Sequence, residues 1–174
     1  MDDVVYEESA RPARRRVEIW LPMLIVAFDQ ATKALVRASL PLNGSVPIVR
    51  GVMDFTHVQN TGTAFGFLNL VDFPFKTALI AVMATTALIA VGFYSASLAR
   101  QQLTARVGLA LIIGGAAGNL LDRVLTGSVV DFVDVYWGSY HFWAFNVADS
   151  AITIGVSLMI LDMLGVGTHV SKTA

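Results

Sequence analysis

Residues 114–150, GGAAGNLLDRVLTGSVVDFVDVYWGSYHFWAFNVADS, decide the fold because they join two apolar runs through a stretch that carries carboxylates. The segment leaves the apolar run before it through small residues and Asp122, and it then passes Asp131 in a hydrophobic setting. It enters the apolar run that follows it behind Asp149. Ionisable groups at the margins of membrane-length segments are costly and usually functional. The segment therefore predicts a polar site at one end of two membrane helices.

The composition of the chain is that of a membrane protein. Of its 174 residues, 55% are hydrophobic and 14% are charged, whereas soluble domains contain about 25% charged residues. The net charge of −1 gives no basic field for nucleic acid. The absence of Cys excludes disulfides and thiol nucleophiles, and the three histidines lack metal-ligand spacing. We therefore expect neither a metal nor another cofactor.

Four apolar runs predict four transmembrane helices. The second run, residues 77–99, holds no charge over about 23 residues, which exceeds the ~20 that a spanning helix needs. The first run covers residues 17–37, and the third covers 107–121 after a short polar turn at 100–106. The fourth run, 151–161, reaches spanning length only if it begins near residue 145 and ends near residue 166.

The other segments divide around these helices. Residues 41–47 hold turn-forming Pro, Asn and Gly, and β-branched and aromatic residues follow to residue 59. This pattern predicts short strands on the bilayer surface. The chain thus divides into a cytoplasmic tail (1–16), a single four-helix domain (17–166) with an extracytoplasmic β-cradle region (38–75) and an extracytoplasmic loop (124–144), and a second cytoplasmic tail (167–174).

The distribution of basic residues predicts the orientation. Four arginines precede the first apolar run, and with both termini on one side that side holds seven of the 12 Lys and Arg residues. Positive charge beside the first helix favours the cytoplasm. We therefore expect both termini in the cytoplasm and the polar residues toward the outer face.

Asp131 and Asp149 are candidates for a catalytic pair. Two carboxyls in an apolar setting repel when both are ionised, so one pKa rises and the pair shares a proton near neutrality. One carboxylate can then deprotonate water while the protonated partner polarises a carbonyl. Alternatively, Asp149 caps a helix and Asp131 is a loop residue at the interface. Asp134 competes with Asp131, and spacing alone does not choose between them.

Polar residues on the first helix and in the segment after it have two readings each. Asp29 and Lys33 share a helix face at i, i+4 spacing, where they either shape a polar site or form a structural ion pair with Lys33 reaching the interface. Asn60 and Gly62 either hold a peptide backbone or form a turn.

The third apolar run ends in a similar ambiguity. Gly114 and Gly118 form a GxxxG step, which favours close helix packing in lipid. Asp122 and Arg123 could anchor the helix end at the interface. Asn119, one turn deeper, is better explained by a position lining a cavity.

Five motifs together resemble one family, lipoprotein signal peptidase, also called signal peptidase II. The resemblance covers residues 19–164. The motifs are DQATK at 29–33, NxGxAF at 60–65, GGAAGNLLDR at 114–123, VDF at 130–132 and FNVAD at 145–149. Each motif alone is weak, but the five in this order on four spans are specific.

The resemblance implies an aspartic endopeptidase of the bacterial inner membrane, with a four-helix bundle and a small extracytoplasmic β-sheet. The family removes the signal peptide from prolipoproteins, just before a Cys that carries diacylglycerol. The motif match assigns catalysis to Asp131 and Asp149 rather than to Asp134. It implies a substrate-binding set of Asp29, Lys33, Asn60, Gly62, Asn119, Arg123 and Asn146. The implied partners are prolipoproteins and membrane lipids, without nucleic acid, and we expect a monomer.

Two other classes of protein compete with this interpretation. Buried acids can relay protons in a small transporter or channel subunit. The acids here gather at one face, however, and the second apolar run offers no polar continuation. A non-enzymatic assembly factor packed through Gly114 and Gly118 is the other alternative, and it would not depend on Asp149.

Overall fold

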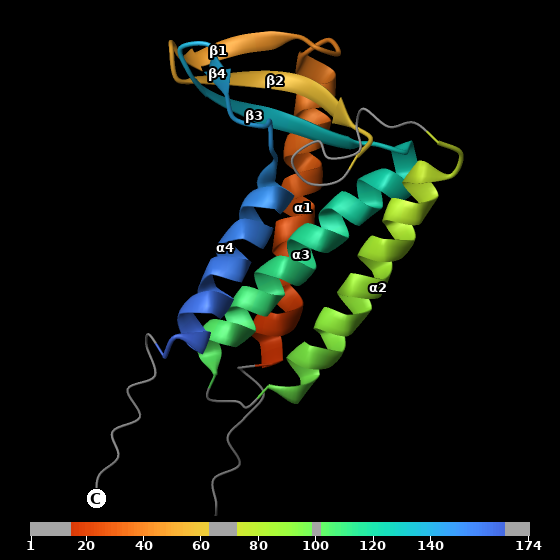
Figure 1. The fold of residues 1–174 in the computed structure, drawn as a ribbon, viewed down its shortest axis with the longest axis vertical. Helices are drawn as coiled ribbons and strands as arrows, with labels where there is room; N and C mark the ends of the chain where they lie inside the picture. The colour runs from red at the N-terminus through yellow and green to blue at the C-terminus, as the bar shows by residue number, and fades with distance from the viewer. Residues whose placement is uncertain (1–14, 63–72, 99–101, 166–174) are drawn as a thin grey trace, which may run out of the picture.

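A bundle of helices carries a small sheet at one end (Figure 1). The computed structural model describes residues 15–62, 73–98 and 102–165. The tails expected at 1–16 and 167–174 lie almost entirely outside this range. In chain order the elements are α1 (Arg15–Ser39), β1 (Ser45–Val49), β2 (Met53–Asn60), α2 (Lys76–Ser97), α3 (Leu103–Thr126), β3 (Val129–Trp137), β4 (Tyr140–His141) and α4 (Val147–Met163).

Three of the helices, α1, α2 and α3, are long and apolar enough to cross a membrane. The prediction of a helical membrane protein with a small sheet is confirmed at this level. The prediction of a polar turn over 100–106 is wrong from Leu103 onward, since α3 begins there. The reason is that Arg106 is buried and its Nε lies 2.7 Å from Glu18 Oε1 of α1, which neutralises its charge inside the bundle.

Glycines allow α3 to approach its neighbours closely, as the GxxxG step predicted. A Cβ on Gly114 would lie 2.9 Å from atoms of Pro22 and Ile25 on α1. On the opposite side, a Cβ on Gly108 would lie 2.8 Å from the carbonyl oxygen of Gly155 on α4. Helix α3 is therefore held between α1 and α4, with backbone against backbone.

The sheet is antiparallel, with strand order β1-β2-β3-β4. Residues 124–144, expected as an extracytoplasmic loop between two helices, supply the strands β3 and β4, which the sequence analysis did not predict. Its run VVDFVDVYW is rich in β-branched and aromatic residues, and it pairs with the free edge of β2. The pairing places Val58 opposite Asp131.

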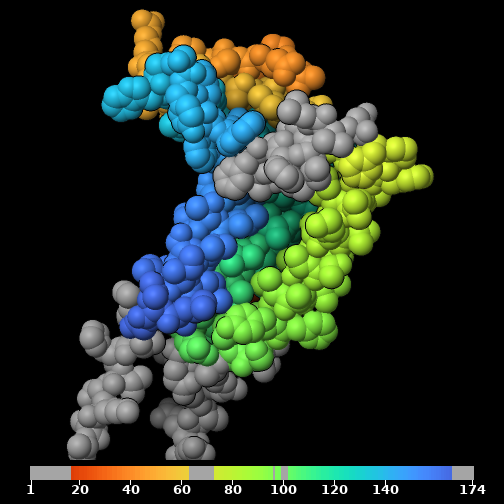
Figure 2. Space-filling view, in the orientation of Figure 1, coloured from red at the N-terminus to blue at the C-terminus, as the bar shows by residue number. Residues whose placement is uncertain are grey.

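The sheet rests on the end of α1 and on the chain that leads into α4. Val130 and Phe132 of β3 are buried with Val36 of α1 in one apolar cluster. The backbone of Phe145 accepts hydrogen bonds from Phe132 and Val133, so β3 is tied to the start of α4. Figure 2 shows the sheet as a layer above the helices, with α3 visible between α4 and α2.

Replacing Gly155 with Ala should destabilise the fold. The added Cβ would meet the carbonyl oxygen of Gly108 and Ile112, and crowding of this kind costs about 1–3 kcal/mol. Gly92→Ala on α2 is the matched control, because no atom lies within 4 Å of its added Cβ. We expect a lower thermal unfolding midpoint in detergent for Gly155→Ala only. Equal midpoints would contradict this account of the α3–α4 contact.

Candidate active site

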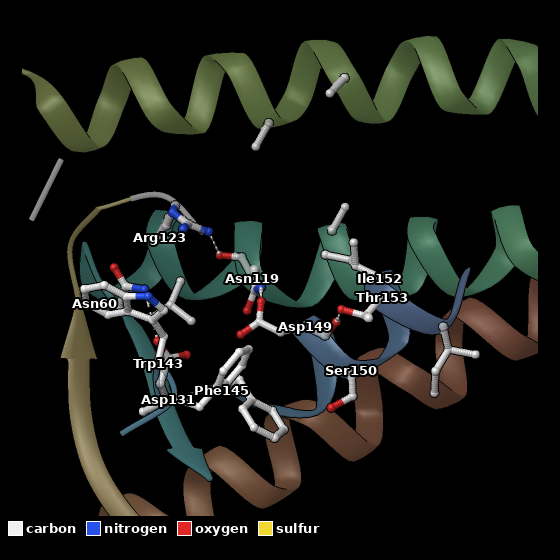
Figure 3. A pocket seen from close by; sticks show the side chains of 17 residues that line it. Asn60, Asn119, Arg123, Asp131, Trp143, Phe145, Asp149, Ser150, Ile152 and Thr153 are labelled. Carbon is white, nitrogen blue, oxygen red and sulfur yellow. Dashed lines mark hydrogen bonds between the residues drawn. The ribbon is translucent and has the colours of Figure 1, made fainter. Parts of the chain in front are cut away.

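Two carboxyl groups from different elements line one pocket (Figure 3). Asp131 lies on β3 and is 3% exposed. Asp149 lies in the first turn of α4. The pocket that they share also receives Asn60, Asn119 and Arg123. The fold therefore brings together five of the residues that the sequence predicted for the site.

Asn146 connects the two carboxyl groups. It is the N-cap of α4 and is fully buried. Its side-chain Nδ2 donates to Asp131 Oδ1 at 2.7 Å, and its backbone N–H donates to Asp149 Oδ2 at 3.3 Å. Its Oδ1 accepts from the backbone N–H of Asp149, which completes a capping box. The helix-capping role considered for Asp149 is thus present, and the same contact fixes its distance from Asp131.

Two further amides hold the remaining carboxylate oxygens. Asn60 Nδ2 donates to Asp131 Oδ2 at 3.0 Å, and Asn119 Nδ2 donates to Asp149 Oδ1 at 2.7 Å. Each carboxyl group therefore accepts two N–H donors. These contacts orient both groups without placing a positive charge on either.

The pKa of Asp131 is raised to about 7. Burial is the main cause, and the negative charge of Asp149 adds to it, while the hydrogen bonds from Asn60 and Asn146 and the charge of Lys33 lower it. Asp131 is thus half-protonated near neutral pH. A pair that holds one proton can supply a general base and a general acid at the same time.

Arg123 lines the pocket from the last turn of α3. Its Nη1 donates to the carbonyl oxygen of Asn119 at 3.2 Å, and its Nη2 donates to that of Gly62 at 3.0 Å. The N–H of Gly62 in turn donates to Asn60 Oδ1 at 2.9 Å. Gly62 therefore acts through its backbone, by holding Asn60 against Asp131. The rest of the motif, residues 63–65, lies outside the described residues.

Asp29 and Lys33 do not line the pocket. The Lys33 ammonium is fully buried, at 2.7 Å from Asp29 Oδ2 and 2.8 Å from Asp122 Oδ2. The alternative in which Lys33 reaches the interface is therefore wrong, because two carboxylates hold it inside. Asp122 is also buried, so its anchoring role at the interface is wrong too. Gly118 leaves room for this cluster, since a Cβ there would lie 2.7 Å from Asp29 Oδ2.

Sequence reasoning missed Arg37, which completes the cluster. Its Nη2 lies 2.9 Å from Asp122 Oδ1, and its side chain is 32% exposed. Asp29, Lys33 and Arg37 follow one another at i, i+4, i+8, which places them on one face of α1. That spacing was a usable signal, but nothing in the sequence indicates that Asp122 of α3 faces it.

Asp134 lies outside the pocket. Its Oδ2 lies 2.8 Å from Nδ1 of His141, which is 55% exposed, and His141 stacks on Tyr136. The geometry thus separates Asp134 from Asp149, a distinction that spacing along the chain did not make. Among the described residues, no cluster of three or more His, Asp or Glu side chains could hold a metal ion.

The pocket has a volume of about 650 Å³ and continues from the carboxyl groups into an apolar part. That part lies between α2, α3 and α4, where small side chains of α2 and α3 face larger ones of α4. Thr153 contributes a hydroxyl, but its Oγ1 donates to the backbone of Asp149. The apolar lining consists of Ala84, Ala87, Ala116, Ile152 and Ile154, together with Val129, Phe142, Trp143, Ala144 and Phe145 near the sheet.

Comparison with known proteins gives a consistent result. Residues 21–165 match the family described as Signal peptidase (SPase) II. A lipoprotein signal peptidase of Geobacter metallireducens is 45% identical over 139 residues, which are 80% of this chain and 85% of the relative. One of Nitratidesulfovibrio vulgaris is 42% identical over 148 residues, covering 85% and 89%.

A solved structure has the same fold. It is a bacterial membrane enzyme determined by the in meso method at 2.3 Å resolution. Its sequence is 31% identical, the TM-score is 0.76, and the match covers 90% of this chain and 93% of that one.

The raised pKa of Asp131 predicts how stability depends on pH. An unfolded Asp has a pKa of about 3.9, so the native state binds the proton more tightly than the unfolded state does. Ionisation of Asp131 should therefore lower the free energy of unfolding as the pH rises from about 4 to about 7. We expect the thermal midpoint of Asp131→Asn minus that of the wild type, both measured in detergent, to increase as the pH rises across this window. Parallel curves would show that Asp131 has an ordinary pKa.

Proposed function

The chain belongs to the signal peptidase II family of aspartic peptidases, and on that premise we propose that it cleaves prolipoproteins with Asp131 and Asp149 as its catalytic pair. The cut falls just before a Cys that carries diacylglycerol. One observation carries this proposal. Two carboxyl groups, buried at Asp131 and half-buried at Asp149, are bridged by Asn146 and face one pocket, and Asp131 has a pKa of about 7.

The reaction requires one proton on the pair. The ionised carboxylate accepts a proton from a water molecule, whose oxygen forms a bond to the scissile carbonyl carbon. The protonated carboxyl donates its proton to the carbonyl oxygen, so the tetrahedral intermediate is neutral. When the C–N bond breaks, the carboxyl that took the proton from water passes it to the leaving amine. The other carboxyl, now ionised, takes a proton from one hydroxyl of the intermediate as the new carbonyl forms, so the pair again holds one proton. Which aspartate holds the proton at the start is a property of the pair.

The apolar part of the pocket supports a lipid-bearing substrate. A diacylglyceryl chain leaves the bilayer only at a cost of ~0.8 kcal/mol per CH₂. Because α2 packs mainly against α3, the pocket between α2 and α4 can open sideways toward lipid. Membrane lipids are therefore part of the binding surroundings, while the amides and Arg123 receive the peptide.

The proposed topology has four spans in the bacterial inner membrane. Helix α4 has 17 residues, but it packs along α3, and apolar side chains from Ile154 to Met163 are exposed on its surface. The start of α1 and the end of α4 lie at the end of the bundle opposite the sheet (Figure 1). With the arginines of residues 11–16 on the cytoplasmic side, the sheet and the carboxyl pair face outward. The protein acts as a monomer, since one chain supplies the whole pair.

Replacing either aspartate with Asn should abolish cleavage. We expect purified wild type in detergent to cleave a diacylglyceryl-modified prolipoprotein, and Asp131→Asn and Asp149→Asn to be at least 10³-fold slower, because neither base nor acid alone completes the reaction. Asp134→Asn is the matched control on the same strand and should keep wild-type activity.

Thermal unfolding in the same detergent checks that the variants are folded. A folded Asp149→Asn that still cleaves would remove Asp149 from the proposal. Wild type that is inert on a verified substrate would favour the proton-relay alternative, which a flux assay in vesicles would test.

Filling the apolar part of the pocket should lower kcat/KM for the lipid-modified substrate more than it lowers the stability of the fold. Ala87→Phe places a ring where the substrate's hydrocarbon is expected, so kcat/KM should fall about tenfold or more. Val82→Phe is the control, because Val82 is exposed on α2 and does not line the pocket. Equal kcat/KM for the two variants would place the lipid chain elsewhere.

A further inference from the structure

Lys33 contacts the site through a single residue, Asn119. Its Nζ donates to Asn119 Oδ1 at 2.9 Å, in addition to its two carboxylate partners Asp29 and Asp122. Lys33 is fully buried and does not line the pocket. It therefore cannot contact a substrate that the pocket holds. It can influence the reaction only through the residues that it contacts or through its charge, which lowers the pKa of Asp131.

The contact with Lys33 fixes which way the Asn119 amide points. Asn119 Oδ1 accepts from Lys33 and also from Asn146 Nδ2 at 3.2 Å. If the amide were turned by 180°, its NH₂ group would face an ammonium and a second NH₂ group, which are all donors. Its oxygen would then face the carboxylate of Asp149. Both new contacts are repulsive, so only the observed orientation lets Asn119 Nδ2 donate to Asp149.

We propose that Lys33 is a positioning residue for the catalytic pair. Its ammonium holds the Asn119 amide in the one orientation that donates to Asp149 Oδ1. This inference rests on the proposed function, and it replaces the substrate-binding role that the sequence suggested for Lys33.

The surrounding charges keep the ammonium in place. Asp29, Asp122, Lys33 and Arg37 form a neutral group of two acids and two bases. Asp29 also accepts from the backbone N–H of Ala148 at 3.0 Å, so the same group holds the first turn of α4 beside Asp149. A buried charge whose partners are all in place is held rigidly, because each lost contact would be expensive.

The test is Lys33→Met, assayed for cleavage of a diacylglyceryl-modified prolipoprotein. We expect kcat to fall about 10- to 100-fold, as for loss of a hydrogen bond to a charged group, with KM within twofold of wild type. A fall confined to kcat marks a residue that acts on the catalytic groups and not on binding.

The matched control is Arg106→Met, which breaks the ion pair with Glu18 that joins α1 and α3 at the opposite end of the two helices. It should lower the thermal midpoint without changing kcat. If Lys33→Met keeps wild-type kcat, or if both variants lose kcat in proportion to their loss of stability, the positioning role is overturned.

A double-mutant cycle tests the route through Asn119. In an Asn119→Ala background, Lys33→Met should lower kcat by less than twofold, because the group it orients is gone. A full additive loss would show that Lys33 acts by another route and would overturn the inference.

Asn119→Asp decides the matter if Lys33→Met does not fold. The carboxylate still accepts from Lys33 but cannot donate to Asp149, so kcat should fall at least tenfold, and unchanged kcat overturns the inference. Wild type, Asp131→Asn and Asp149→Asn are assayed alongside. An inert wild type, or activity in a folded variant of either aspartate, refutes the proposed function itself and the inference with it. Normal behaviour of these three with unchanged kcat in Lys33→Met refutes the inference alone.

Discussion

The N-cap of α4 is the contact on which the arrangement of the site depends. Asn146 ends the segment that returns from the sheet and begins the helix that carries Asp149. One fully buried side chain thus satisfies a helix terminus and binds Asp131 of β3, while its backbone binds Asp149. An uncapped buried helix end would leave N–H groups unpaired, so the fold requires a cap at the start of α4. The residue that supplies this cap, Asn146, also holds the two carboxyl groups at their separation.

The rest of the bundle serves this junction by bringing backbones close. Glycines of α3 allow α1 on one side and α4 on the other to approach, and at Gly118 the space gained is taken by the Asp29 carboxylate. The charges buried there come in opposite pairs, so the polar cluster is neutral before the catalytic pair is counted. A single charge in that position would be too costly to bury. Close packing and charge pairing therefore depend on each other, because the small residues leave space for charged groups that can be buried only when they are paired.

The sheet covers one end of the bundle and also positions two site residues near α4. Asp131 could not lie near α4 on a loose connection, but β3 is fixed by pairing with β2 and by its backbone bonds to Phe145. Asn60, at the end of β2, is brought to the other oxygen of Asp131 by the same pairing. The two strands act as rigid arms that hold an acid and its hydrogen-bond donor over the end of the bundle.

The sequence by itself determined the membrane class, the approximate bounds of the helices, the close packing at Gly114 and Gly118, and the family. Composition, the length of apolar runs and the order of motifs can all be read along the chain without knowledge of its contacts. Only the tertiary structure decided that residues 129–137 form a strand, that Asp134 points to His141, and that Lys33 is buried between Asp29 and Asp122. Strand β3 pairs with residues 69 to 82 positions earlier in the chain, Asp134 contacts His141 7 positions later, and Lys33 contacts Asp122 89 positions later. Spacing along one helix or strand carries no record of which partner faces it. Burial and pairing are properties of contacts between elements. For that reason the spacing that places Arg37 on one face of α1 with Asp29 and Lys33 did not reveal its partner, Asp122 of α3.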